Sequence, residues 1–220
     1  VVKVMVKGAD WFKAMGTKES AGTKLLSISG DCKHPGVYEI EWGMGIRELL
    51  ELAGATSVQA VQVGGPSGTC INPTQFQREI SFEDLATGGS VIVIGKQRNL
   101  LKDVVVNFMD FFIEESCSSC APCRSLTVIL RNKLQKILDG NGSRKDINEL
   151  YQWTKYMKAS NRCGLGQTAA NPILSTIENF RQLYEDLVIP EEEFVSTFNM
   201  EEAVADSCAY VGRIPIFEHH

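Results

Sequence analysis

The first third of the 220-residue chain alternates short apolar runs with turn signals, a pattern typical of β-strands. The runs 24–29 and 36–41 are separated by a short loop and predict a hairpin. An amphipathic helix is expected at 46–53, and further strands are expected at 60–63 and 91–94. The last strand is apolar on both faces, so we expect it at the centre of the sheet.

The order strand–strand–helix–strand–strand across residues 23–98 is that of a β-grasp domain, a small α+β unit. After Gly95 the apolar period lengthens to that of amphipathic helices, which are expected at 103–115, 124–139, 146–158 and 171–187. Four such helices in succession predict a bundle over residues 99–190. The predicted fold class is therefore α+β, a β-grasp domain followed by a four-helix bundle.

Three local patterns complete this outline. Asn171 is expected to cap the last helix, because its side chain can accept a free backbone amide and Pro172 favours a first turn. The glycine-rich segment 64–68 lacks the Lys-Ser/Thr of a phosphate loop and predicts a turn whose backbone passes close to another surface. Residues 191–220 are expected to form an acidic linker and tail with a short helix at 199–211, and the terminal pair His219-His220 is set aside as a possible tag remnant.

The composition narrows the function classes. A net charge of −5 without a basic run disfavours nucleic-acid binding. No segment reaches the ~20 uninterrupted apolar residues of a membrane helix, so we expect no direct membrane insertion. Seven cysteines are an odd number, and four of them stand at ligand spacing, which indicates a reducing compartment and favours the cytoplasm.

The cysteines are the strongest chemical signal in the chain. Cys117, Cys120 and Cys123 occur at every third residue, and Cys163 follows forty residues later. Neighbouring cysteines in so short a loop would form strained disulfides, whereas thiolates at this spacing suit one side of a 4Fe–4S cluster whose fourth ligand is remote. The two cysteine loops follow the first and the third helix, so an up-down bundle brings all four sulfurs to the same end.

Other interpretations of these residues stay open. Four cysteines also serve structural zinc sites, although zinc ligands usually come as two separate pairs. A redox-active thiol pair is disfavoured because no βαβ unit surrounds the motif. Arg124 is either a surface arginine that opens a helix or a charge that stabilises a reduced cluster. Cys32, Cys70 and Cys208 are predicted to be small buried hydrophobic residues, and His34 a turn residue.

Two motifs resemble a known family. Residues 115–124 (Glu-Ser-Cys-Ser-Ser-Cys-Ala-Pro-Cys-Arg) and 163–172 (Cys-Gly-Leu-Gly-Gln-Thr-Ala-Ala-Asn-Pro) closely resemble the NADH-binding flavoprotein subunit of respiratory complex I. The same pattern occurs in the diaphorase subunits of NAD-reducing hydrogenases and NAD-dependent formate dehydrogenases. Residues 29–39 look like the start of the soluble-ligand-binding β-grasp domain of this family.

The resemblance implies a role for each motif. Cys117, Cys120, Cys123 and Cys163 would ligate a 4Fe–4S cluster, and Ser116, Gly164 and Leu165 would face a flavin mononucleotide (FMN). The implied partners are a preceding flavin/NADH domain, a 2Fe–2S thioredoxin-like subunit and an iron–sulfur electron-transfer subunit.

The departures from the family pattern are also informative. The glycine-rich flavin and nucleotide loop of the family has no counterpart here, and residues 10–16 resemble the exit segment of the domain that carries it, so residues 1–22 are assigned to that exit. We therefore expect this chain alone to bind neither FMN nor NAD(H). Ser118 stands where the family commonly has glycine.

The leading hypothesis is an electron-transfer module of an NAD(H)-linked oxidoreductase. It would pass single electrons between FMN and downstream iron–sulfur centres, without a catalytic acid, base or nucleophile of its own. Segments 198–203 and 211–213 look more like the hydrogenase and formate dehydrogenase relatives. The alternatives are the same subunit of an NADH:quinone oxidoreductase and a non-redox interaction module stabilised by zinc.

Overall fold

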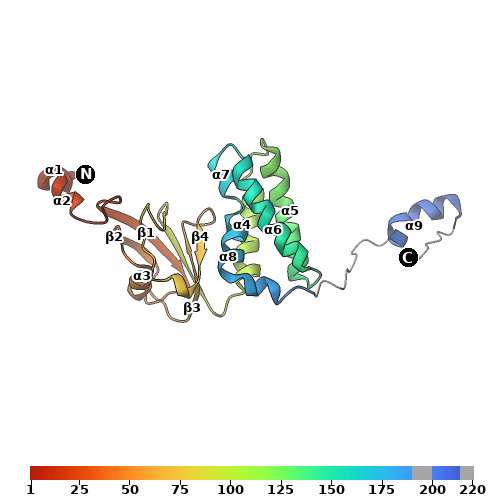
Figure 1. The fold of residues 1–220 in the computed structure, drawn as a ribbon, viewed down its shortest axis with the longest axis horizontal. Helices are drawn as coiled ribbons and strands as arrows, with labels where there is room; N and C mark the ends of the chain where they lie inside the picture. Colours follow the sequence, from red (N-terminus) through yellow and green to blue (C-terminus); the bar gives the residue numbers. More distant parts are fainter. Residues whose placement is uncertain (190–199, 214–220) are drawn as a thin grey trace.

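A computed structural model describes residues 1–189 and 200–213 of the chain. A five-stranded mixed sheet lies beside a group of helices, and the helix nearest the sheet is α8 (Asn171–Glu185) (Figure 1). The α+β class is confirmed. Two short helices, α1 (Val2–Lys7) and α2 (Ala9–Lys13), precede the sheet.

The sheet has the order β2-β1-β5-β3-β4, in which β1 and β5 run parallel and the other neighbours antiparallel. Its strands are β1 (Thr23–Gly30), β2 (Gly36–Glu41), β3 (Val58–Val63), β4 (Thr69–Ile71) and β5 (Ser90–Gly95). The predicted hairpin is β1–β2, and the apolar strand expected at the centre is β5, which lies between β1 and β3. The three-residue edge strand β4 was not predicted, because it is too short to show an alternating pattern.

One face of the sheet is covered by α3 (Ile46–Leu52), the helix expected there. Ile46 and Leu49 pack against Leu26, Ile28 and neighbouring strand residues in a continuous apolar core. A short 3-10 turn, η1 (Pro73–Gln75), follows β4. This core explains the strand–strand–helix order, because each element buries one apolar face against the others.

The helical part begins with a π-helical segment, η2 (Leu100–Val105), that continues into α4 (Val106–Glu114). It continues with α5 (Ala121–Leu138), α6 (Arg144–Ser160), the short α7 (Gly164–Thr168) and α8. The four predicted helices are thus α4, α5, α6 and α8, and their apolar stripes meet in a second core that includes Leu130, Leu134, Ile147 and Ile173. The helix α7 was not predicted, because so short a segment gives no readable period.

Two local predictions about the last helix need correction. Asn171 is the first residue of α8 rather than its cap, and its side-chain amide donates to the Ser67 carbonyl instead of accepting a backbone amide. The helix is interrupted at Phe180, whose backbone is non-helical at φ −141° and ψ 35°. Phe180 packs between the sheet and the helices, next to Cys70 and Leu100. Packing between the two parts therefore overrides the regular helix that the apolar period predicts.

The remaining cysteines differ in burial. Cys70, on β4, is buried as predicted, and burial raises the pKa of its thiol to about 12. Cys32 and Cys208 are only half-buried, so the prediction that they are buried was wrong, although Cys32 packs against the core of the sheet. His34 is a turn residue as predicted, with its carbonyl accepting the Tyr38 hydroxyl at 2.5 Å.

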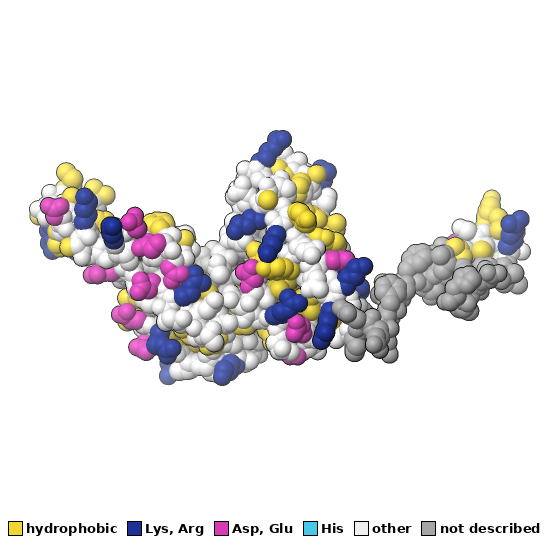
Figure 2. Space-filling model, viewed as in Figure 1, with side chains coloured by type: hydrophobic (Ala, Val, Ile, Leu, Met, Phe, Trp, Pro, Cys, Tyr) yellow, Lys and Arg dark blue, Asp and Glu magenta, His cyan; other side chains and the backbone are white. Residues whose placement is uncertain are grey.

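The predicted tail helix corresponds to α9 (Met200–Val211). The linker at 191–193 and the terminal His219-His220 lie outside the described residues. None of the helices within the described ranges is long and apolar enough to span a bilayer. On the face shown in Figure 2, acidic side chains gather over the sheet and basic side chains are frequent over the helices.

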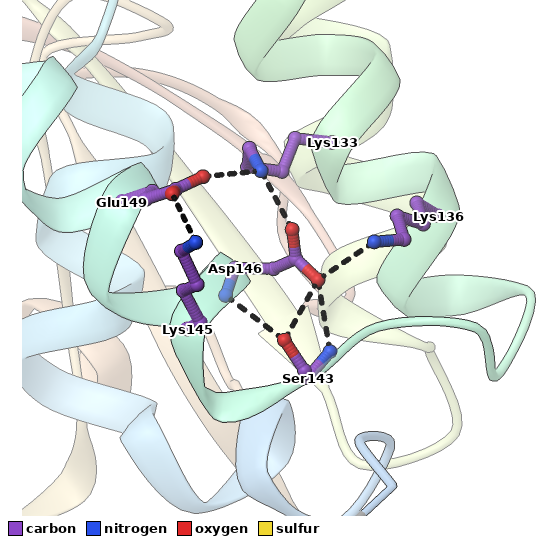
Figure 3. A network of polar contacts seen from close by, with 6 residues as sticks. All are labelled: Lys133, Lys136, Ser143, Lys145, Asp146 and Glu149. Atoms are coloured by element: carbon purple, nitrogen blue, oxygen red, sulfur yellow. Dashed lines mark hydrogen bonds and ion pairs between the residues drawn. The ribbon is translucent and has the colours of Figure 1, made fainter. Parts of the chain in front are cut away.

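A polar network joins the C-terminal end of α5 to the start of α6 (Figure 3). Asp146 accepts Lys133 at 2.6 Å and Lys136 at 3.0 Å, and it forms a capping box with Ser143. Lys133 also pairs with Glu149 at 2.7 Å. Burial alone would raise the pKa of the Asp146 carboxyl, but these hydrogen bonds outweigh it and hold that pKa far below its usual range. The network therefore fixes the α5–α6 hairpin at the end away from the cysteines.

Replacing Asp146 by asparagine should lower the free energy of unfolding by about 1–3 kcal/mol at neutral pH, because charged hydrogen bonds are lost. A depressed carboxyl pKa stabilises the fold fully above the unfolded-state value of about 3.9, and this contribution is lost progressively as the pH falls from there to the folded-state pKa. The difference in urea stability between wild type and Asp146→Asn should therefore begin to shrink as the pH falls below about 4 and continue to shrink toward the lower folded-state pKa. Asp139→Asn, which loses one exposed contact from Gln135, is the matched control. A gap that stays constant with pH would contradict this account.

Candidate metal centre

The four motif cysteines lie at one end of the helical part. Cys117 and Cys120 are in the connection from α4 to α5, Cys123 is in the first turn of α5, and Cys163 lies between α6 and α7. The start of α5 and the short α7 meet at the same end of the helices, the upper end in Figure 1. All four cysteines line a single cavity of about 160 Å³. The tertiary structure thus brings together the four residues that the spacing selects.

The four thiols differ in exposure. Cys123 is buried at 6% exposure, Cys120 is half-buried, and Cys117 and Cys163 are exposed. Cys120 and Cys163 are also the N-cap residues of α5 and α7. The positive end of the α5 dipole therefore faces the cavity, which favours negative charge on the thiolates.

Asn161 is the residue that sequence reasoning missed. Its side chain is buried, with Oδ1 accepting the Cys123 amide at 3.1 Å and Nδ2 donating to the carbonyls of Met157 and Gly166. Gly166 has no room for a side chain, because an added Cβ would lie 2.8 Å from the Asn161 side chain. One amide group thereby joins α5, α6 and α7. The only available signal was an asparagine two residues before Cys163, which by itself does not indicate a role.

The loop 116–120 is held by short-range contacts. The Ser116 hydroxyl lies 3.4 Å from the Cys123 sulfur and accepts the Ser118 amide at 3.2 Å. The exposed Arg124 donates to the Ser118 carbonyl at 3.1 Å, so its guanidinium braces the loop from the first turn of α5. This contact gives Arg124 a structural role that neither sequence interpretation had included.

The backbone of Ser118 adopts φ +60°, the left-handed region that disfavours residues with a Cβ. Glycine, which the resembling family commonly has at this position, adopts such a φ without steric cost. Ser118 keeps the left-handed geometry at an energetic cost.

Three residues were predicted to face a flavin. Ser116 and Leu165 both line the cysteine cavity, whereas Gly164 is next to open space, with no atom within 4 Å of the point that a Cβ would occupy. Leu165 also packs against the helical core. These positions leave the flavin-facing role a prediction.

Two kinds of metal group use four cysteine ligands, a structural zinc ion and an iron–sulfur cluster. Among the residues described in the structure, no three His, Cys, Asp or Glu side chains are placed so that they could hold one metal ion. A tetrahedral zinc requires sulfurs about 2.3 Å from a common point. The four cysteines nevertheless line one cavity, and three of them come from a single short loop. An iron–sulfur cluster, with one cysteine for each iron, fits this arrangement.

Comparison with known families agrees with this chemistry. Residues 103–187 match the family described as the NADH-ubiquinone oxidoreductase-F iron–sulfur binding region. Residues 103–187 belong to this family. The matched region contains η2 from Asp103 onward, α4 to α8 and all four cysteines, and it supports a 4Fe–4S cluster in this chain.

Similar proteins cover both the sheet and the helices. The chain is 41% identical over 206 residues to the NAD-reducing hydrogenase HoxS subunit alpha of Cupriavidus necator, covering 93% of this chain and 34% of that protein. It is 31% identical over 193 residues to a subunit of the NADH-quinone oxidoreductase of Mycobacterium tuberculosis, covering 84% of this chain and 43% of that protein. The chain thus spans less than half the length of these relatives.

A solved structure supports the same fold. A crystal structure of an NAD+-reducing NiFe hydrogenase in the H2-reduced state aligns with a TM-score of 0.84 and 34% identity, covering 97% of this chain and 38% of that chain. The β-grasp sheet and the helices therefore occur together in a hydrogenase chain, with the same arrangement.

Replacing Ser118 by glycine should stabilise the protein by about 1 kcal/mol, because glycine adopts positive φ without steric cost. Urea unfolding would measure the change. Ser119→Gly is the matched control, since Ser119 is also exposed and its φ is not positive. Equal effects of the two substitutions would show that the left-handed backbone of Ser118 carries no strain.

Proposed function

We propose that this chain is the electron-transfer part of an NAD(H)-linked oxidoreductase and that Cys117, Cys120, Cys123 and Cys163 hold its 4Fe–4S cluster. The observation that carries the proposal is the convergence of these four thiols on one cavity, in a region that matches an iron–sulfur binding family. When bound, the cluster supplies a site that accepts and releases one electron at a time.

The chain supports electron transfer through the placement and exposure of its four cysteines, and the proposal requires no acid or base from its residues. Cys123 is packed into the helical core, and Leu165, which packs against the same core, also lines the cavity. Burial of one ligand lowers access of water to that side of the site, while the exposed Cys117 and Cys163 leave the other side open to a partner. Electrons need such an exposed edge, because transfer to another centre requires close approach.

The proposed partners are those that the family resemblance implies. We assign FMN and NAD(H) to a preceding domain of the full subunit, with Ser116, Gly164 and Leu165 facing the flavin. A 2Fe–2S thioredoxin-like subunit and an iron–sulfur electron-transfer subunit would complete the path, in the cytoplasm. Identity to the hydrogenase relative exceeds identity to the quinone oxidoreductase relative, at 41% against 31%, which favours a hydrogenase-type assembly.

Reconstitution with iron and sulfide tests the cluster directly. The wild-type chain should bind about four irons and four sulfides, show broad visible absorption and bleach with dithionite. Changing any one of the four cysteines to serine should sharply reduce iron content and colour. Cys32→Ser is the matched control, because Cys32 lies in the sheet part and should leave iron content unchanged. A colourless protein with one zinc per chain would overturn the proposal.

Ser116 offers a finer test of the same site. Its hydroxyl lies within hydrogen-bond distance of the Cys123 sulfur, and hydrogen bonds to cluster sulfurs favour the electron-rich reduced state. Ser116→Ala should therefore lower the midpoint potential, on the order of 59 mV if the bond favours the reduced state tenfold. An EPR-monitored redox titration measures the shift, with Ser119→Ala as the control. An unchanged potential with full iron content would exclude the hydrogen bond.

A further inference from the structure

The glycine-rich turn between β3 and β4 touches the segment that follows Cys163. The hydroxyls of Ser67 and Thr168 hydrogen-bond at 3.0 Å, and the Asn171 side-chain amide donates to the Ser67 carbonyl at 2.6 Å. Ser67 and Thr168 are 101 positions apart in the chain. The turn predicted from sequence to pass close to another surface thus lies against the segment linking α7 to α8.

The turn has a well-defined shape. Gly64 and Gly65 have φ values of +90° and +65°, and a Cβ on Gly68 would lie 1.8 Å from the Val63 carbonyl oxygen. The buried Gln62 donates from Nε2 to the Gly65 carbonyl at 2.5 Å. Only glycines fit this path, and Gln62 secures it from inside. Ser67 is therefore presented in a fixed position.

The strand after the turn is also attached to α8. The Cys70 amide donates to the Ser175 hydroxyl at 3.2 Å, and the Cys70 carbonyl accepts the Asn179 side chain at 2.7 Å. Asn72 in turn donates to the Asn179 carbonyl at 2.8 Å. Side chains of α8 thus pair with the free edge of β4 as a neighbouring strand would. The distance from the turn to the start of α8 is set by these bonds.

Cys163 itself has little local support. Its side chain is exposed, and the following turn, α7, is held to the helical part by the packing of Leu165 and by the Gln167 side chain, which donates to the Asn161 carbonyl at 3.1 Å. Two further contacts hold it. Asn161 holds it from the inside at Gly166, and the sheet holds it at Thr168, whose hydroxyl also donates to the Gly164 carbonyl at 2.8 Å. The contact through Ser67 therefore secures the side of this short helix that faces the sheet.

We propose that Ser67 is a positioning residue for Cys163. The sheet, through the turn at 64–68, holds Thr168 and with it α7, so that the Cys163 sulfur is kept in place relative to the loop of the other three cysteines. Part of this inference rests on the proposed function, namely that Cys163 is a cluster ligand. The β-grasp part thereby sets how long the fourth ligand stays in place, although it contributes no ligand itself.

The test compares Ser67→Ala, Thr168→Val and the double variant in the 220-residue chain. Hydrogen–deuterium exchange of the α7 amides is measured without the cluster, and the rate of iron loss to a chelator is measured with it. Ser67→Ala should speed exchange at α7 on the order of 5-fold, with a similar acceleration of iron loss. Because Ser67 acts through Thr168, adding Ser67→Ala to Thr168→Val should not accelerate α7 exchange or iron loss any further. Ser29→Ala, an exposed serine on β1, is the matched control.

Two outcomes would overturn the inference. Exchange at α7 in Ser67→Ala that equals exchange in Ser29→Ala would show that the contact does not hold α7. If Ser67→Ala accelerated exchange equally in the wild-type and Thr168→Val backgrounds, Ser67 would not act through the Thr168 hydroxyl. If the wild-type chain binds no iron, the proposed function fails, yet the exchange measurement still decides whether Ser67 positions α7.

Discussion

The Asn161 side-chain amide is the contact on which the arrangement of the four cysteines depends. Three of the cysteines share one loop, whereas the fourth lies beyond the whole α5–α6 hairpin, so some contact must join the two loops. Asn161 does so by accepting the Cys123 amide and donating to carbonyls on α6 and α7. All these groups are buried, so each would be costly to leave without a partner. At the opposite end of the hairpin, the Asp146 network fixes the same two helices.

Four thiolates at one site would repel one another, and several features of the fold would offset such repulsion. The α5 N-terminus faces the cavity, and Cys120 takes the N-cap position of that helix. Two thiols remain exposed, so water screens part of their charge. Arg124 adds a cation near the loop while bracing the strained Ser118 backbone. These features favour an anionic group at this position without requiring a buried counter-charge.

The sheet and the helices are joined by polar contacts as well as by apolar packing. Cys70, Leu100 and Phe180 form a small core between the two parts. Around it, side chains of α8 satisfy the free backbone groups of β4, an edge that would otherwise be open to pairing with another chain. The glycine turn extends this attachment to the cysteine end of the helices. The sheet is therefore attached to the helices up to the end where the four cysteines lie.

The sequence alone determined the elements whose apolar period is long enough to read, namely the hairpin, the central strand β5 and the four longer helices. It also determined the cysteine spacing and, through helix count, that both loops lie at one end. The tertiary structure decided the rest. The elements β4 and α7 are too short to show a period. The Asn171 side chain donates a hydrogen bond to the Ser67 carbonyl, because the turn at 64–68 lies beside it. Likewise, the roles of Asn161 and Ser118 depend on partners or backbone angles that no local pattern specifies, since contacts between distant segments exist only once the chain has folded.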